Sequence, residues 1–265
     1  MKIYKAFAKV NIFLKITGTR ADYHEIISRF MRVQSLYDEL SFVAKEESVS
    51  KAKKFEIIGD FSCSTEQNTI YKAYIALLES LDDNSANSLK TLMQKYAIHV
   101  DKKIPAFAGL GGGSSDAATY LKMCNEVLHL GLSKNELATI GLKVGADVPF
   151  FIYGYDSANV SGIGEVVEEF KEPLLELEVF TPRIEISTPK VYRIYRKNFF
   201  APIDGFKTDE LKKTSSLDIL KNMSVDEAND LFKPALQEYK ELKNHYRHGY
   251  YFSGSGSSFF RVKEE

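Results

Sequence analysis

The sequence predicts an α+β fold, because strand-like and helical stretches follow one another in runs rather than in strict alternation. The first 44 residues are dominated by alternating apolar and polar side chains, which is typical of strands. Helical periodicity begins at residue 69, and a glycine-rich stretch at 109–113 leads into a further helical run. The 265 residues suffice for one large or two modest domains. We expect a boundary near residue 155, between an N-terminal domain at 1–155 and a C-terminal domain at 156–265.

The first predicted strand covers residues 3–16 and separates two kinds of side chain. Its aliphatic face consists of Ala8, Val10, Ile12 and Leu14. Its other face carries Phe7, Lys9, Asn11 and Phe13. Lys9 and Asn11 are about 6.6 Å apart at a strand rise of roughly 3.3 Å per residue. On its own this pair is most simply a solvent-facing strand side, although the flanking phenylalanines argue against full exposure.

The remaining elements follow from pattern and composition. TGTRADYH at 17–24 has the composition of a turn, and the charged stretch 45–54 is predicted to be a solvated hairpin or loop. Further strands are predicted at 30–44, 54–59, 96–104, 165–170, 176–186 and 251–262. Helices are predicted at 69–81, 88–95, 217–222, 224–232 and 234–247. Residues 105–133 are predicted to be a glycine-rich loop running into a long helix, and 133–154 a helix, a loop and a short strand.

The composition argues against several classes of protein. With 35 basic and 36 acidic residues the formal net charge is −1, whereas nucleic-acid-binding proteins are usually basic. No apolar run approaches the roughly 20 residues that span a bilayer, and the lysine-containing start lacks the apolar stretch of an export signal. The histidines form no HExxH pattern, which disfavours a zinc hydrolase. Two distant cysteines, Cys63 and Cys124, are typical of unpaired thiols in a reducing compartment. We therefore expect a cytoplasmic protein that binds neither nucleic acid nor membranes.

The glycine-rich stretch has the properties of a phosphate cradle. Gly109, Gly111, Gly112 and Gly113 allow close approach of the backbone to a ligand, and successive N–H groups can converge on an anion. The helix start adds further donors and the positive end of its dipole, with Ser114 or Ser115 as the expected N-cap. The stretch lacks the Walker A and dinucleotide-binding patterns. A flexible connector before a capped helix is the less favoured alternative.

Two further stretches are ambiguous when taken alone. Asp147, in GADVPFF, is most simply a turn residue that caps local backbone. The segment YYFSGSGSSFF at 250–260 is most simply a tight hairpin. Its alternative interpretation is a second loop of small residues that approaches the functional site.

Taken in order, AKVNIFLKITG, PAFAGLGGGSSDAAT, GADVPFF and SGSGSSFF resemble the GHMP kinase superfamily of small-molecule kinases. The resemblance covers nearly the whole chain. It implies a two-domain α+β fold with the active site in the cleft between the domains, the domain at 1–155 being the one that binds ATP. Within the superfamily the chain resembles the branch that phosphorylates the 2-hydroxyl of a cytidine-diphosphate-linked methylerythritol in non-mevalonate isoprenoid biosynthesis.

The resemblance also implies roles for individual residues. Asp147 is expected to be the general base and Lys9 its charge partner. Substrate contacts are expected from Asn11, Tyr23, His24, Thr188 and Tyr192, with the aromatic rings around the cytosine. ATP contacts are expected from Asn68, Lys102, Pro105, Ala106, Phe107, Ala108, Gly109, Leu110, Gly111, Gly112, Gly113, Ser114 and Ser115. Mg²⁺ is expected with ATP, no metal ligand is identified, and either a monomer or a homodimer is compatible with the sequence.

Three positions depart from the family pattern. Asp22 meets Tyr23 directly where the family usually has an intervening glycine. Phe107 stands at a glycine position, so we expect it to avoid glycine-only backbone angles and to alter the start of the loop. Asp116 stands where asparagine is common, and its charge could favour the helix dipole yet oppose nearby phosphates.

Two alternatives to this function remain open. The first is a kinase for another small alcohol of the homoserine or mevalonate type, whose substrate would give the rings of Tyr23, His24 and Tyr192 no base to stack on. The second is a non-catalytic protein, either a nucleotide sensor or a nucleic-acid-binding module. The glycine-rich stretch by itself permits a sensor, whereas the presence of both Lys9 and Asp147 weighs against it.

Overall fold

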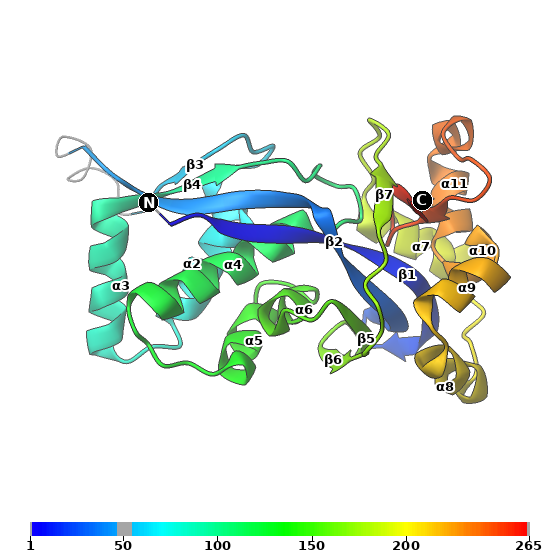
Figure 1. The fold of residues 1–265 in the computed structure, drawn as a ribbon, viewed down its shortest axis with the longest axis horizontal. Helices are drawn as coiled ribbons and strands as arrows, with labels where there is room; N and C mark the ends of the chain where they lie inside the picture. Colours follow the sequence, from blue (N-terminus) through cyan, green and yellow to red (C-terminus); the bar gives the residue numbers. More distant parts are fainter. Residues whose placement is uncertain (1, 47–54, 264–265) are drawn as a thin grey trace. The chain divides into compact units, whose positions relative to one another are not determined.

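A computed structural model describes residues 2–46 and 55–263 of the chain and confirms the α+β class (Figure 1). Most of the predicted loop at 45–54 lies outside the described residues. The chain divides into two compact units, and neither unit is continuous in sequence. Unit 1 comprises residues 1–8, 36–104 and 112–154, and unit 2 comprises residues 9–35, 105–111 and 155–265. The chain passes from unit 1 to unit 2 between residues 154 and 155, which is near the expected boundary. The division into domains 1–155 and 156–265 stays a prediction.

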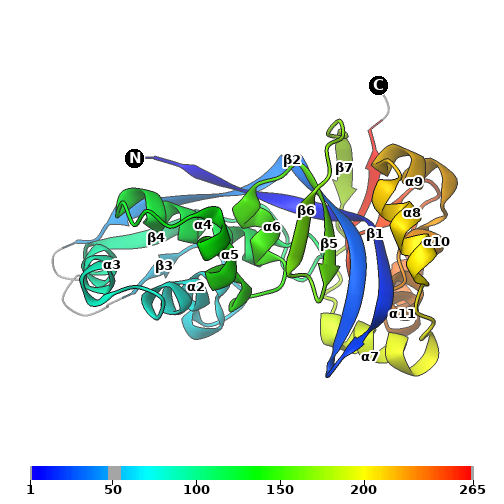
Figure 2. The same ribbon diagram turned by 90° about the horizontal axis from the view of Figure 1, so that it is seen from below.

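Unit 1 combines strands with a group of packed helices. The strands β1 (Tyr4–Arg20) and β2 (Tyr23–Ala44) pair with each other and begin or end in this unit. Strand β4 (Tyr96–Asp101) runs antiparallel to β2, with Glu39 opposite Asp101, and β3 (Ile57–Ile58) runs parallel to β4. The helices of this unit are η1 (Thr65–Gln67), α2 (Thr69–Leu78), α3 (Asp83–Lys95), α4 (Gly112–Val127), α5 (Lys134–Leu142) and α6 (Val148–Tyr153). Helix α4 packs against α2, α5 and α6, and Figure 2 shows it beside α5 and α6.

Unit 2 holds a second group of strands and helices. Strand β2 continues here antiparallel to β5 (Ser157–Gly162), which pairs with β6 (Val166–Glu169). A separate three-stranded sheet has the order β7-β9-β8, with β7 at Leu177–Phe180, β8 at Tyr251–Phe252 and β9 at Phe259–Val262. The helices are α7 (Thr188–Asn198), α8 (Gly205–Lys213), α9 (Ser216–Asn222), α10 (Val225–Ala228), α11 (Phe232–Glu238) and η2 (Lys240–Asn244). Helix α7 packs against α11 over a core that includes Val191, Tyr195 and Phe232.

Several predicted elements differ from the structure. The predicted short strand near the end of 133–154 is wrong, because VPFFIY forms the helix α6. Pro149 is tolerated in the first turn of a helix, and Gly154 ends α6 with a left-handed φ of 71°. The predicted turn at 17–24 is shorter than expected, because only residues 21–22 separate β1 from β2. Strand β5 and helices α7 and α8 were not predicted.

Candidate functional site

The first half of the glycine-rich segment, residues 105–111, lies in unit 2 against the loop at 253–258. The Ser253 hydroxyl donates to the Gly109 carbonyl oxygen at 2.9 Å, and the Ser258 amide donates to the Ala108 carbonyl oxygen at 3.1 Å. Gly109 has a φ of 73°, and a Cβ atom there would lie 2.1 Å from the Ser253 carbonyl oxygen. The segment 250–260 is therefore both the predicted hairpin, formed by β8 and β9, and a loop that contacts the glycine-rich segment.

Lys9 and Asn11 are buried beneath this half of the segment. The Lys9 ammonium donates to Asn11 Oδ1 at 2.7 Å and to the Gly109 carbonyl oxygen at 3.1 Å, and it lies 4.5 Å from the centre of the Phe30 ring. The Asn11 amide donates in turn to the Ser28 hydroxyl at 2.9 Å. Lys9 is only 3% exposed, so the simplest interpretation of this pair, a solvent-facing strand side, is wrong.

Phe107 takes up a left-handed backbone conformation in this loop. Its φ is 53°, so the expectation that a phenylalanine would avoid such angles here is wrong. Phe107 is 56% exposed, and its neighbours Pro105 and Ala106 are also exposed. The next apolar residues, Ala108 and Leu110, are buried. An L-residue in this region costs roughly 1–2 kcal/mol. The hydrogen bond from the Ser258 amide to the carbonyl oxygen of the next residue, Ala108, anchors the loop beside it.

The second half of the segment belongs to unit 1 and forms the start of α4. The helix begins at Gly112, so the predicted N-cap role of Ser114 or Ser115 is wrong: both residues lie within its first turn. Gly113 is exposed, and its carbonyl oxygen accepts a hydrogen bond from the Thr69 hydroxyl at 2.6 Å. The first four N–H groups of an α-helix have no partner within the helix. They lie at the positive end of the dipole of a 16-residue helix, and this arrangement can bind an anion.

The two predicted adenosine contacts lie elsewhere in unit 1. Asn68 caps α2, where its Oδ1 accepts from the Ile70 amide at 2.9 Å, and its Nδ2 has no hydrogen-bond partner among the described residues. Lys102 donates to Asp38 at 2.5 Å and to Asp116 at 2.7 Å. Burial lowers the pKa of Lys102, but the carboxylates of Asp116 and Asp38 outweigh it, so this pKa is raised above the usual lysine value. The ammonium therefore stays charged.

Asp147 occupies the N-cap position of α6 and is half-buried in unit 1. In the described part of the chain its side chain accepts no hydrogen bond from the first turn of α6. Asp147 therefore stands in the turn before α6 without a side-chain cap of that helix. Lys9 lies in unit 2, so the two expected catalytic side chains come from different units.

The expected substrate residues His24 and Tyr192 come together in unit 2, and Thr188 lies on the same helix as Tyr192. The rings of His24 and Tyr192 lie 5.1 Å apart at an angle of 34°, and Tyr195 meets His24 edge-on at 5.9 Å. Thr188, one helical turn before Tyr192 on α7, shares a 2.6 Å hydrogen bond with Ser255. Burial, together with a smaller effect of Arg196, lowers the pKa of His24, so its imidazole is neutral at pH 7.

The His24 ring also has an unsatisfied polar atom. Its Nε2 is buried and has no hydrogen-bond partner within the described residues. Tyr23 is 65% exposed, and among the described side chains no ring contact joins it to His24 or Tyr192. Of the five expected substrate residues, His24 and Tyr192 therefore meet through their rings, and Thr188 lies one helical turn from Tyr192.

The sequence interpretation missed several side chains at these sites. Ser253 and Ser255 lie in the loop of small residues, so its second interpretation could have identified them. Ser28 and Asp38 carry no local signal, because each is a single polar residue within the long strand β2. Their roles depend on contacts with residues that are distant in sequence.

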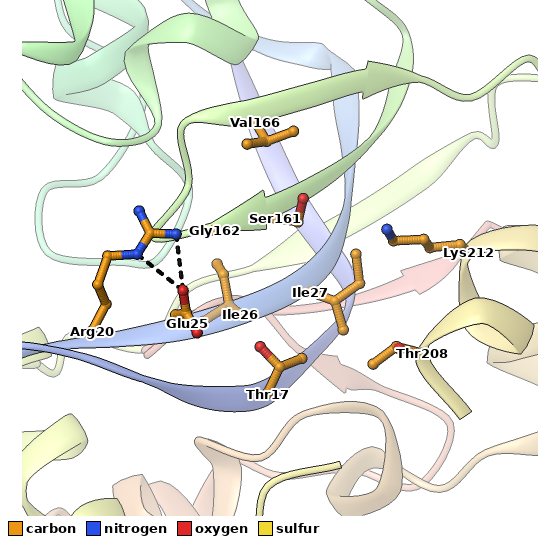
Figure 3. Close-up of a pocket in the computed structure, with 10 residues that line it drawn as sticks. All are labelled: Thr17, Arg20, Glu25, Ile26, Ile27, Ser161, Gly162, Val166, Thr208 and Lys212. Atoms are coloured by element: carbon orange, nitrogen blue, oxygen red, sulfur yellow. Dashed lines mark hydrogen bonds and ion pairs between the residues drawn. The ribbon is translucent and has the colours of Figure 1, made fainter. Parts of the chain in front are cut away.

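A separate cavity in unit 2 contains none of the expected site residues (Figure 3). It has a volume of about 320 Å³ and lies between the β1–β2 hairpin, β5 and α8. Arg20 is engaged there by Glu25 at 2.9 Å and by Glu165 at 2.7 Å. The guanidinium of Arg20 is thus already paired with carboxylates. Within the described residues, no helix combines the length and the apolar character that crossing a membrane requires, and no group of three potential metal ligands is found.

Comparison with known proteins identifies the family. Residues 68–155 match the family model of the GHMP kinases N terminal domain. A 4-diphosphocytidyl-2-C-methyl-D-erythritol kinase from Sulfurimonas denitrificans is 74% identical over 265 residues, which are 100% of this chain and 98% of that protein. The kinase of the same name from Helicobacter pylori is 40% identical and covers 98% of this chain and 94% of that protein.

Solved structures agree with this assignment. A crystal structure of 4-(cytidine 5'-diphospho)-2C-methyl-D-erythritol kinase has a TM-score of 0.71 and 28% identity, over 99% of this chain and 90% of that chain. The mevalonate kinase of Methanococcus jannaschii, at a TM-score of 0.56 and 15% identity over 99% of this chain and 90% of that chain, shares the fold. The GHMP kinase fold is thereby confirmed, and the chain belongs to the 4-diphosphocytidyl-2-C-methyl-D-erythritol kinase family.

Proposed function

We propose that the chain transfers the γ-phosphoryl group of ATP to the 2-hydroxyl of 4-diphosphocytidyl-2-C-methyl-D-erythritol, in the cytoplasm and as a step of non-mevalonate isoprenoid biosynthesis. The products are the 2-phosphate and ADP. The observation that carries the proposal is the 74% identity, over the full chain, to the kinase of that name from Sulfurimonas denitrificans. Mg²⁺ is proposed to arrive bound to ATP, as part of the co-substrate.

The phosphates of ATP are proposed to lie on residues 105–115. The first N–H groups of α4, which have no partner within the helix, support this placement, because Gly112 and Gly113 offer these donors without side chains in the way. Asn68 and Lys102 are proposed to contact the adenosine. The free Nδ2 of Asn68 supports its role, since an amide donor suits the acceptors of a purine edge.

The chemical step is assigned to Asp147 and Lys9. Asp147 is proposed to accept the proton of the 2-hydroxyl as its oxygen bonds to the γ-phosphorus and the bond to the ADP oxygen breaks. Lys9 is proposed to keep this carboxylate ionised. Opposite charges about 4 Å apart interact by roughly 4 kcal/mol at an effective dielectric constant of 20. The burial of Lys9 supports the assignment, because a cation screened from water acts more strongly on a nearby anion.

The cytosine is proposed to bind at His24 and Tyr192, with Tyr23 and Thr188 nearby and Asn11 toward the methylerythritol. The two adjacent rings provide π faces for a flat base. The buried Nε2 of His24, on a neutral ring, offers a polar atom to the edge of the base. A homoserine or mevalonate substrate has no base, so it leaves this atom unsatisfied.

An ATP-consumption assay with a panel of alcohols tests the reaction. We expect turnover with the cytidylyl substrate and little with homoserine or mevalonate. Preference for one of the latter alcohols would replace the proposed substrate, and ATP binding without turnover on any alcohol would favour a nucleotide sensor.

The Asp147→Asn variant tests the proposed base. We expect turnover to fall by about 10²- to 10⁴-fold, because the hydroxyl proton loses its acceptor, while the dissociation constant for ATP stays the same. The matched control is Asp82→Asn at the N-cap of α3 in the same unit, where asparagine caps equally well. Near-normal turnover in Asp147→Asn would refute the assignment.

A further inference from the structure

A buried charge cluster lies in unit 1 beside the start of α4. The Lys102 ammonium is shared by Asp38 and Asp116, at 2.5 and 2.7 Å. Asp38 is fully buried and Asp116 is 2% exposed. Two carboxylates face one ammonium, so the cluster carries one net negative charge when both are ionised. A net charge of this kind is costly inside a protein.

The two carboxylates differ in how well their charges are stabilised. Asp38 Oδ1 accepts hydrogen bonds from the backbone amides of Lys103 at 2.5 Å and Ile104 at 2.8 Å, in addition to the Lys102 contact. Asp116 Oδ1 is buried and has no hydrogen-bond partner among the described residues. The charge of Asp116 therefore has fewer hydrogen-bond donors to stabilise it than the charge of Asp38. Burial, with a further contribution from Asp38, raises the pKa of Asp116 to about 7 despite the opposing effect of Lys102.

The cluster lies where the helix presents its free amides. A Cβ atom on Gly112, the first residue of α4, would lie 3.6 Å from the Lys102 ammonium nitrogen. A lysine ammonium has three N–H donors. Two of them are used by Asp38 and Asp116, and the described residues provide no partner for the third. The remaining donor and the first-turn amides are thus close enough to contact the same bound nucleotide.

The charged surroundings of Asp116 are simple. Asp38 faces it from β2 and Lys102 from the end of β4. Helices α2, α5 and α6 also pack against α4, and in the described part of the chain none of their charged side chains forms an ion pair or hydrogen bond with Asp116. The charge of the cluster therefore depends on these three groups.

We infer that Asp116 is a positioning residue for the nucleotide, which holds the Lys102 ammonium beside the first turn of α4 and takes up a proton when the nucleotide binds. The inference rests on the proposed function, because it requires ATP phosphates at the start of α4. A bound phosphate adds negative charge near the cluster, which favours the state in which Asp116 is neutral and the cluster has no net charge. Linkage is reciprocal: if the bound nucleotide raises the proton affinity of Asp116 by a given factor, protonation of Asp116 raises the affinity for the nucleotide by that same factor.

The test compares the full chain with Asp116→Asn, which retains an oxygen for Lys102 and resembles the protonated carboxyl. At each pH we take the ratio of the KM for MgATP of the unmodified protein to the KM of Asp116→Asn. We expect this ratio to rise about fivefold or more from pH 6 to pH 8, while kcat changes little. The titration of ATP itself cancels in this ratio. Glu39→Gln removes a half-buried carboxylate that pairs with Lys103 and should retain the unmodified pH profile.

A second measurement needs no variant. In protein labelled with ¹³C at the aspartate carboxyls, MgADP should shift the midpoint of the Asp116 titration upward. Identical pH profiles of KM in both proteins, or an unmoved midpoint while MgADP binds, would overturn the inference and leave the proposed function intact. Failure of the unmodified protein to bind MgADP at all would instead count against the proposed function.

Discussion

The two halves of the glycine-rich segment are held in different ways. Residues 105–111 in unit 2 lie against the main chain of the 253–258 loop, and their glycines at 109 and 111 have positive φ angles. Residues 112–116 in unit 1 are helical, and they meet the side chains of Ile104, Thr69 and Lys102. The first half is constrained by backbone atoms and the second by side chains, including a charge cluster.

This difference determines what each half tolerates. Backbone atoms in a packed interior cannot move without disturbing the elements that contain them, whereas a side chain can adopt another rotamer. Gly109 in the first half is therefore required for steric reasons. In the second half glycine matters mainly for access to the amides and to Lys102.

The largest effect is expected from Gly109→Ala. The new Cβ would meet the Ser253 carbonyl oxygen at 2.1 Å and also force alanine to a φ of 73°. We expect a loss of about 3 kcal/mol or more in the free energy of unfolding, measured with urea. Gly131→Ala is the matched control, because its φ is 70° but nothing lies within 4 Å of its Cβ. Equal losses in both variants would show that backbone strain, rather than the contact with Ser253, dominates.

A smaller effect is expected from Gly112→Ala. Its Cβ would lie 2.9 Å from Ile104 Cγ2, so overpacking costs about 1–3 kcal/mol, and the better helix propensity of alanine returns about 1 kcal/mol. We expect a net loss near 1 kcal/mol in urea unfolding, together with a raised KM for ATP because the new methyl group stands beside the first-turn amides and Lys102. A loss as large as that of Gly109→Ala would contradict the distinction between the two halves.

The smallest effect is expected from Phe107→Gly. Relief of the left-handed φ stabilises the folded state by about 1–2 kcal/mol, and the entropy of glycine in the unfolded chain offsets about 0.5–1 kcal/mol. The exposed ring contributes little packing, so the melting temperature should rise slightly. The melting temperature of Ala21→Gly should also rise slightly, because Ala21 has a φ of 51° in the β1–β2 turn. A lower melting temperature for Phe107→Gly alone would assign a packing role to the ring.

Local signals in the sequence were sufficient for much of the fold and for the glycine-rich segment that leads into α4. Alternation predicted β1 and much of β2, and periodicity predicted α2, because burial of one face imposes a repeat of 2 or 3.6 residues. The order of the motifs identified the superfamily. The missed α7 illustrates the limit, because only Val191 and Tyr195 of its residues are buried and most of the rest are polar or charged.

Only the tertiary structure decided which side chains meet. Lys9 appears in the sequence as one lysine of an alternating strand, and Asp116 as one acidic residue in the first turns of a helix. Their burial depends on contacts with Gly109, Asp38 and Lys102, which lie up to 100 residues away along the chain. Burial and charge pairing are properties of neighbours in space, whereas periodicity and turn chemistry are properties of neighbours in sequence. The sequence by itself therefore determined the elements and the family, and the folded structure determined the environment of each ionisable group.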